Sequence, residues 1–304
     1  MALSVRACAK VNLVLRVGPL RADGFHDLAT LMTPVNLADD VLVRAWPGRR
    51  GAVTCHTPGR PDLDGASNLA ARAAEAFRSR FGVRDRVAIT VKKRVPVVAG
   101  LGGGSSDAAA TLRALARAYG VRDRAALAAA GLEVGSDVPF FLGSGPAWAR
   151  GRGERLEPAH VAPLHLVILY PRHPSNAIRA GEAYRWLDAS RQQSGGRATL
   201  RAGGLHPPFR PDAVTNDLQG PCFERHPLLK TLARHLVSAG AASAIMSGSG
   251  PSVFGIFTER AGSLRARARL TEVFGADIEV HAVRTLQRHP GVTPWKSPRS
   301  ASSP

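Results

Sequence analysis

The amino-acid sequence predicts an α+β fold with two lobes. The chain has 304 residues, and a single hydrophobic core usually stops growing near that length, so two packed domains are expected. Segments in which apolar and polar residues alternate predict strands, and they are interspersed with alanine- and leucine-rich segments of helical period. Charged residues make up an ordinary 21%, which gives no reason to treat the bulk of the chain as disordered.

The N-terminal segment predicts a strand that carries polar side chains on one face. Apolar residues occupy every second position from residue 5 to residue 17, and Lys10 and Asn12 fall on the opposite face. A turn is expected at 21–24. The next strand-like segments are 28–35 and 40–45.

The rest of the first half alternates between helix and strand. Helical periodicity covers 68–81, and a strand is expected at 87–92. Ser105 or Ser106 is expected to cap a helix that Gly120 ends, because a serine side chain accepts hydrogen bonds from the first free amides of a helix. The last helix expected in this half is 124–130.

The second half repeats this mixture. The expected strands are 165–170, 243–246, 253–257 and 278–283, and the expected helices are 180–187, 228–239 and 261–274. Residues 191–211 are rich in Gly, Pro and Arg and predict an exposed loop. The chain is therefore divided into an N-terminal lobe at 1–150, a C-terminal lobe at 151–288 and a basic, flexible tail at 289–304.

The charge of the chain suits three classes of partner. A formal net charge of +18 would suit nucleic acid, a membrane surface or an anionic small molecule. The arginines are scattered, no stretch interleaves aromatic with basic residues as an RNA-binding sheet does, and no segment resembles a membrane span. We expect a phosphorylated small molecule, without nucleic acid or membrane, and keep a non-catalytic nucleotide- or nucleic-acid-binding module as the alternative.

The cysteines indicate the cellular compartment, and the lysines indicate candidate functional residues. Three widely spaced cysteines are too few for a disulfide framework or a metal site, which fits a cytoplasmic protein. Only five of the 41 basic residues are lysines, so each lysine is a candidate for a specific role.

A glycine-rich loop is the strongest chemical signal. Residues 100–106, Gly-Leu-Gly-Gly-Gly-Ser-Ser, lie between a predicted strand and a predicted helix, where free helix amides and the helix dipole attract anions. The run is neither a dinucleotide-binding fingerprint nor a Walker A loop, because Ser105 takes the place of the last glycine and no Gly-Lys-Ser follows. It predicts a phosphate cradle, with a flexible connector as the alternative.

Five motifs in order resemble one family. Residues 96–109, PVVAGLGGGSSDAA, resemble the second motif of the GHMP superfamily, which comprises galactokinase, homoserine, mevalonate and phosphomevalonate kinases. Residues 9–13 and 247–254 resemble its N-terminal and C-terminal motifs. Residues 23–28 and 135–141 resemble the branch whose substrate carries a cytidine diphosphate.

The resemblance implies an activity and its cofactors. That branch uses ATP and Mg²⁺ to phosphorylate the 2-hydroxyl of 4-diphosphocytidyl-2-C-methyl-D-erythritol in non-mevalonate isoprenoid precursor synthesis. Another GHMP small-molecule kinase, of the homoserine or mevalonate type, is the alternative. The implied ATP-binding residues are Pro96, Val97, Val98, Ala99, Gly100, Leu101, Gly102, Gly103, Gly104, Ser105 and Ser106, with Asn68, for which helix capping is the alternative.

Two residues are implied as catalytic. Phosphoryl transfer needs a group that positions and deprotonates the acceptor hydroxyl, and positive charge beside the moving phosphoryl group. Asp137, in a Gly-Ser-Asp-Val-Pro loop, suits the first role and Lys10 the second; the alternatives are a capping aspartate and a solvated lysine. Either Ser105 or Ser106 could also bind Mg²⁺.

The substrate end needs an aromatic surface and an edge reader for cytosine. Phe25 and His26 supply them where the family has an aromatic residue, usually tyrosine, and a histidine. Tyr184 is the expected second aromatic, and a core phenylalanine with a structural histidine is the alternative. The other implied substrate-binding residues are Asn12, Asp137, Gly248 and Ser249.

The resemblance also details the fold. It implies an N-terminal lobe like domain 2 of ribosomal protein S5, with a left-handed βαβ unit, and a ferredoxin-like C-terminal lobe. Connection rules alone would favour a right-handed crossover. Whether the chain is a monomer or a homodimer is left open.

Overall fold

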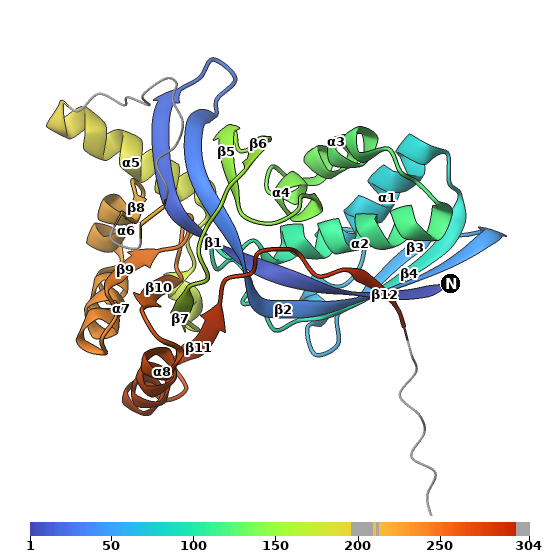
Figure 1. Ribbon diagram of the computed structural model, residues 1–304. Helices are drawn as coiled ribbons and strands as arrows, with labels where there is room; N and C mark the ends of the chain where they lie inside the picture. Colours follow the sequence, from blue (N-terminus) through green and yellow to red (C-terminus); the bar gives the residue numbers. More distant parts are fainter. Residues whose placement is uncertain (196–208, 211–212, 296–304) are drawn as a thin grey trace, which may run out of the picture.

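Two sheets, each with its own helices, form the predicted two-lobed α+β fold (Figure 1). The computed structural model describes residues 1–195, 209–210 and 213–295. Most of the loop expected at 191–211 and the end of the expected tail, 296–304, lie outside these described residues.

The first sheet is built around two long strands. β1 (Ala2–Leu20) and β2 (His26–Arg50) pair antiparallel, which confirms the predicted strand; residues 7–13 of β1 are all buried, so exposure alternates only toward its two ends. The two segments expected at 28–35 and 40–45 are one continuous strand. The remaining strands of this sheet are β3 (Val53–His56), β4 (Asp85–Lys92), β5 (Ala147–Gly151), β6 (Arg155–Pro158), β8 (Thr215–Asn216) and β12 (Val292–Pro294).

Helices of the first lobe cover this sheet with a core rich in alanine and phenylalanine. They are α1 (Leu69–Phe81), α2 (Gly103–Tyr119), α3 (Arg124–Val134) and α4 (Val138–Leu142), with a short 3-10 turn η1 (Pro61–Leu63). Phe77, Phe140 and Phe141 are fully buried in that core. β3 and β4 are parallel and flank α1, so they form the expected βαβ unit, whose left-handed crossover stays a prediction.

The second sheet has the order β11-β7-β10-β9, with every pairing antiparallel. Its strands are β7 (His165–Pro171), β9 (Ser243–Met246), β10 (Val253–Phe257) and β11 (Ile278–Arg284). Its helices are α5 (Ala180–Ser194), α6 (Gln219–Arg225), α7 (Pro227–Ser238) and α8 (Arg260–Phe274), with a 3-10 turn η2 (Pro174–Asn176). The four strands of this sheet, with α5, α6 and α7 between β7 and β9 and α8 between β10 and β11, follow a β-α-β-β-α-β succession, which confirms the ferredoxin-like lobe.

A shared hydrophobic cluster joins the lobes. Val11 and Leu13 of β1 are fully buried and pack with Ile168 of β7 and Phe254 of β10. Because successive side chains of a strand point to opposite faces, this packing leaves Lys10 and Asn12 of β1 facing the other way. The middle of β1 is therefore the place where polar groups can meet both lobes.

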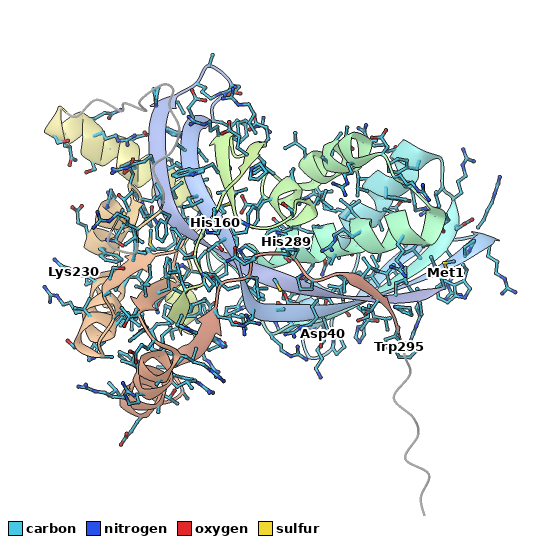
Figure 2. All side chains as sticks on the ribbon, in the orientation of Figure 1. Met1, Asp40, His160, Lys230, His289 and Trp295 are labelled. Atoms are coloured by element: carbon cyan, nitrogen blue, oxygen red, sulfur yellow. The ribbon has the colours of Figure 1, made fainter. Side chains whose placement is uncertain are left out.

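The C-terminal segment differs from the flexible tail that the sequence suggested. After β11 the chain returns to the first lobe, where β12 pairs with β1 and the Trp295 amide donates to the Ala2 carbonyl (3.1 Å). Figure 2 shows His289 and Trp295 along this return. A three-residue strand beside prolines is too short to show an alternation, so β12 could not be predicted from the sequence.

The boundary expected at 150 also falls inside an element. β5 pairs with β2, so the β5–β6 hairpin extends the first sheet. None of the helices in the described part of the chain has both the length and the apolar character needed to cross a membrane.

Candidate active site

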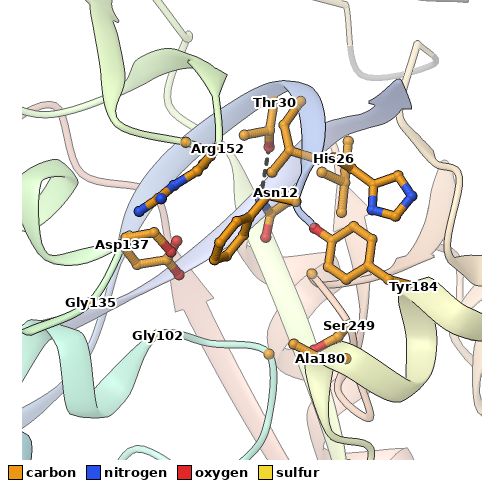
Figure 3. A pocket seen from close by; sticks show the side chains of 18 of the residues that line it. Asn12, His26, Thr30, Gly102, Gly135, Asp137, Arg152, Ala180, Tyr184 and Ser249 are labelled. Atoms are coloured by element: carbon orange, nitrogen blue, oxygen red, sulfur yellow. Dashed lines mark hydrogen bonds between the residues drawn. The ribbon is translucent and has the colours of Figure 1, made fainter. Parts of the chain in front are cut away.

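A cavity of about 700 Å³ opens where the two lobes meet (Figure 3). It is lined by β1, β2, the glycine-rich loop before α2, the loop before α4, the first turns of α5 and the loop between β9 and β10. The predicted site residues that line it are Lys10, Asn12, Phe25, His26, Gly100, Gly102, Ser105, Asp137, Tyr184, Gly248 and Ser249.

The glycine-rich loop ends in a helix that no side chain caps. α2 begins at Gly103, and its N-cap is Gly102 in the left-handed conformation (φ +68°), so the predicted cap at Ser105 or Ser106 is wrong. A Cβ atom at Gly102 would lie 2.9 Å from the Phe141 ring and 3.1 Å from Lys10 Cγ, so only glycine fits there. The first amides of α2 therefore stay available to an anion.

The two serines of the loop differ in placement. Ser105 lines the cavity, whereas Ser106 is 3% exposed and does not. The other predicted ATP-binding residues that do not line this cavity are Pro96, Val97, Val98, Ala99, Leu101, Gly103, Gly104 and Asn68. Their contact with ATP stays a prediction.

Asn68 is engaged at the start of α1. Its Oδ1 accepts from the Ala70 amide (2.9 Å), and its Nδ2 donates to the Leu63 carbonyl (2.8 Å). The structure therefore bears out the capping alternative for this residue.

Lys10 is buried, and its one carboxylate partner, Asp137, lies at the long end of the ion-pair range. Its Nζ donates to Asn12 Oδ1 (2.5 Å) and lies 3.8 Å from Asp137 Oδ2. Asn12 Nδ2 in turn donates to Thr30 Oγ1 (2.8 Å), the dashed line in Figure 3. Burial lowers the pKa of Lys10, and Asp137 offsets only part of that effect. Positive charge at Lys10 is thus incompletely neutralised inside the protein, so the solvated-lysine alternative is wrong.

Asp137 immediately precedes α4 and lines the cavity. Its side chain makes no capping hydrogen bond to that helix, which excludes the simple capping alternative. The apolar residues that follow, including Phe140 and Phe141, are buried and anchor the loop. The Asp137 side chain is 38% exposed, so its carboxylate faces the cavity rather than the core.

The loop between β9 and β10 closes the site from the second lobe. A Cβ atom at Gly248 (φ +56°) would lie 3.2 Å from Asn12 Oδ1 and 3.3 Å from Lys10 Nζ. Asn216 Nδ2 donates to the carbonyls of Met246 (2.8 Å) and Gly248 (2.7 Å) and fixes this loop. Asn216 was not predicted as a site residue, because an isolated Asn belongs to no motif.

Side chains of both lobes meet at the other end of the cavity. The rings of His26 and Tyr184 stack with centroids 5.2 Å apart, and Asp188 Oδ1 lies 3.0 Å from His26 Nε2. The Arg152 guanidinium lies 4.3 Å from the centroid of the Phe25 ring, which is exposed. Arg152 and Asp188 were both missed by the sequence analysis. The spacing of four residues between Tyr184 and Asp188, one helical turn, could have indicated the second.

A second buried charge cluster lies beneath the glycine-rich loop. Lys93 Nζ donates to Asp39 Oδ2 (2.5 Å) and to Asp107 Oδ2 (2.8 Å), and Asp107 lies in the first turns of α2. Burial alone would lower the pKa of Lys93, but the two carboxylates outweigh it and the net shift is upward. Burial raises the pKa of Asp107 well above its usual value, against the opposing effect of Lys93.

The site offers few oxygen ligands for a metal ion. The described residues contain no group of three or more His, Cys, Asp or Glu side chains that could hold one. The Ser105 hydroxyl and the Asp137 carboxylate line the same cavity. This fits Mg²⁺, which is commonly bound by one or two protein oxygens together with nucleotide phosphates.

Two family models match the chain. The GHMP kinases N terminal domain matches residues 68–145, and the GHMP kinases C terminal domain matches residues 209–276. The first covers the glycine-rich loop and Asp137, and the second covers the loop between β9 and β10.

Curated relatives match most or all of the chain. A protein of Anaeromyxobacter dehalogenans named 4-diphosphocytidyl-2-C-methyl-D-erythritol kinase is 61% identical, over 100% of this chain and 97% of its own length. One of the same name from Gloeobacter violaceus is 37% identical over 84% of this chain and 86% of its own.

Solved structures of small-molecule kinases also superpose on this chain. A 4-(cytidine 5'-diphospho)-2C-methyl-D-erythritol kinase superposes with a TM-score of 0.72 and 34% identity, covering 93% of this chain and 99% of its own. A homoserine kinase from Cytophaga hutchinsonii, at 19% identity and a TM-score of 0.65 over 96% of each chain, shares the fold.

Proposed function

Because the chain belongs to the GHMP kinases and, within them, to the 4-diphosphocytidyl-2-C-methyl-D-erythritol kinases, we propose that its cavity transfers the terminal phosphate of ATP to the 2-hydroxyl of that substrate. It is a phosphotransferase that acts on a small-molecule alcohol and serves isoprenoid precursor synthesis. The homoserine- and mevalonate-kinase alternatives and the non-catalytic binding module are not favoured by these relatives.

The phosphates of ATP bind at the start of α2. Gly102 caps the helix without a side chain, so first-turn amides and the helix dipole face the incoming anion. Gly100 also permits a close approach, because a Cβ atom there would lie 2.1 Å from the Ser247 carbonyl oxygen. The loop between β9 and β10 thereby holds the cradle in place from the second lobe.

The pairing of Lys10 with Asp137 is the observation that carries the mechanism. The acceptor oxygen attacks the terminal phosphorus, its proton passes to the Asp137 carboxylate, and ADP leaves. Lys10, buried and 3.8 Å from Asp137, supplies positive charge where negative charge accumulates on the transferred group. Asn12 holds the Lys10 ammonium in position through its 2.5 Å hydrogen bond.

The cytidine diphosphate lies toward the far end of the cavity. Phe25 and Tyr184 offer aromatic faces to the base, and His26 offers a ring edge. Arg152 lines the cavity beside Phe25 and provides a guanidinium for the substrate diphosphate. Gly248 and Ser249 add backbone and hydroxyl groups from the second lobe.

Ser105 is the side chain placed to help hold Mg²⁺ on the nucleotide, since Ser106 is buried away from the cavity. Bound there, Mg²⁺ would spread the negative charge of the phosphates. The three cysteines, all free and buried, suit a reducing compartment, so we place the protein in the cytosol.

Product formation tests the proposal. The protein is incubated with ATP and Mg²⁺ and, in parallel, with 4-diphosphocytidyl-2-C-methyl-D-erythritol, homoserine or mevalonate, and phosphorus NMR identifies the product. We expect a new phosphomonoester only with the first substrate. Turnover confined to homoserine or mevalonate would reject the proposed substrate.

A further inference from the structure

α5 holds the His26 imidazole in two ways at once. Tyr184 and Asp188 are four residues apart on this helix and therefore lie on the same face. Tyr184 stacks on the imidazole with an interplanar angle of 15°, while Asp188 Oδ1 meets its Nε2 atom at 3.0 Å. The helix thus fixes both the plane of the ring and its rotation within that plane. Figure 3 shows His26 and Tyr184 side by side at this end of the cavity.

The contact with Asp188 decides which nitrogen of the neutral imidazole carries the proton. A carboxylate has only acceptor oxygens, so Nε2 must donate to it. Nδ1 then keeps its lone pair and is an acceptor. Among the residues that the structure describes, Nδ1 has no hydrogen-bond partner, and His26 lines the cavity with its side chain 7% exposed.

An acceptor at this position can tell the two pyrimidines apart. Cytosine carries an amino group at C4, which donates, whereas uracil carries a carbonyl oxygen there, which only accepts. An acceptor at Nδ1 would pair with the amino group of cytosine and face the carbonyl oxygen of uracil lone pair to lone pair. A buried polar group left without a partner in this way lowers affinity for the wrong ligand.

We infer that Asp188 is a positioning residue that makes the site selective for cytosine over uracil, by fixing His26 as a hydrogen-bond acceptor at Nδ1. This inference rests on the proposed function, because it assumes that the base binds against His26. It assigns Asp188 no contact with the substrate. Its only action is to set the proton and the orientation of the imidazole.

Nucleotide binding tests the inference without requiring turnover. The affinities of CDP and UDP are measured by calorimetry with the ATP site saturated by a non-hydrolysable ATP analogue. We expect the unaltered protein to bind CDP at least about tenfold more tightly than UDP, the effect of one well-made hydrogen bond. Asp188→Ala should weaken CDP binding and leave UDP binding unchanged or stronger, so that the ratio falls below about threefold.

A substitution on the same helix provides the control. Gln193 is exposed on α5, and Gln193→Ala should leave the CDP-to-UDP ratio unchanged. A purely structural role for Asp188 would weaken CDP and UDP binding to the same extent. An equal affinity of the unaltered protein for the two nucleotides, or an unchanged ratio in Asp188→Ala, would overturn the inference.

Nitrogen NMR of histidine-labelled protein reports the tautomer directly. We expect His26 to carry its proton on Nε2 in the unaltered protein and to become a mixture of tautomers in Asp188→Ala. A proton on Nδ1 in the unaltered protein would overturn the inference. If the enzyme instead failed to phosphorylate its proposed substrate while CDP selectivity and the Nε2 proton were observed, the proposed reaction would fail and the role of Asp188 would stand.

Discussion

Two lysines of the first lobe, the buried Lys10 and the largely buried Lys93, are neutralised to very different extents. Lys93 makes short contacts with two carboxylates, at 2.5 Å and 2.8 Å, and its pKa is raised despite its burial. Lys10 has one carboxylate at 3.8 Å, and its pKa is lowered by burial. The exposed fractions of the two side chains are similarly small, 6% and 11%, so the difference lies in their partners.

The difference indicates a structural role for Lys93 and a catalytic role for Lys10. A buried charge is tolerated when its partners are close and its geometry is complete, and it is costly when they are not. Lys93 is complete without any ligand and ties Asp39 to α2 through Asp107. Lys10 lacks a close counter-charge in the described residues, and in the proposed mechanism the transferred phosphoryl group supplies it. Each of the following substitutions tests one side of this contrast.

Removing the carboxylate beside Lys10 should have the largest effect. Asp137→Asn keeps the shape of the side chain but cannot take the proton of the acceptor hydroxyl, so kcat should fall by about 10³-fold. The affinity for ATP, measured by fluorescence titration, should change little, because the phosphates are proposed to bind at the start of α2 rather than at Asp137. A variant with kcat within a few-fold of the unaltered enzyme would remove Asp137 from the mechanism.

Removing the charge of Lys10 should have the next largest effect on rate without a cost in stability. We expect Lys10→Met to lower kcat by about 10²-fold or more. Because burial already disfavours the ammonium, the free energy of unfolding in urea should stay within about 1 kcal/mol of the unaltered value or rise. A large loss of stability in this variant would contradict the assignment of Lys10 to the ligand.

Lys93→Met should show the opposite pattern. It leaves Asp39 and Asp107 buried without their cation, which should lower the free energy of unfolding by about 3 kcal/mol. The kcat of the folded protein should fall by less than about tenfold, since Lys93 does not line the cavity. If Lys93→Met lost rate as severely as Lys10→Met while remaining equally stable, the contrast between the two lysines would be wrong.

His289 extends the comparison to a buried group that is neutral. Of the substitutions considered, replacing it should change stability the least. Burial, reinforced by the charge of Arg113, lowers its pKa to about 4, against a hydrogen bond with the Phe140 backbone. Because the unfolded chain binds a proton near pH 6.5 and the folded chain does not, this residue should remove stability as the pH falls from 6.5 toward 4, by up to about 1.4 kcal/mol per pH unit. Above pH 6.5 the imidazole is neutral in both the folded and the unfolded chain, so it removes no stability there.

The measurement for His289 is the difference between two proteins. His289→Phe keeps a ring against Phe140 and Phe141 but cannot be protonated. Urea unfolding at pH 7, 6 and 5 should show a shallower loss of stability in this variant than in the unaltered protein. Equal slopes in the two proteins would show that His289 is not buried in neutral form.

The sequence predicted the parts of the molecule that depend on local patterns. The alternation along β1 predicted the strand and the face that carries Lys10 and Asn12, and the glycine run located the start of α2 to within a few residues. The capping serine was wrong because tertiary packing decides the cap: Gly102 must fit against the Phe141 ring and Lys10.

The sequence singled out Lys10 by its strand face and its motif, but it did not show that Lys10 and Lys93 would be neutralised to such different extents. Scarcity marked both lysines equally, since only five occur in the chain. The two lysines differ in their contacts: Lys93 donates to Asp39 and Asp107, which lie 54 and 14 residues away from it along the chain. Asp188 reaches His26 across 162 residues and from the other lobe. Such contacts depend on the folded topology; the four-residue spacing of Tyr184 and Asp188 indicates a shared helix face, but it does not identify His26 as the partner.

A crystal structure with a non-hydrolysable ATP analogue and 4-diphosphocytidyl-2-C-methyl-D-erythritol would be the most direct test of the contrast between the two lysines. We expect the terminal phosphate beside Lys10 and the first amides of α2, with the 2-hydroxyl of the substrate within hydrogen-bond distance of Asp137 and Lys93 touching neither ligand. A triphosphate bound away from residues 100–106, or an acceptor hydroxyl far from Asp137, would contradict the proposed mechanism.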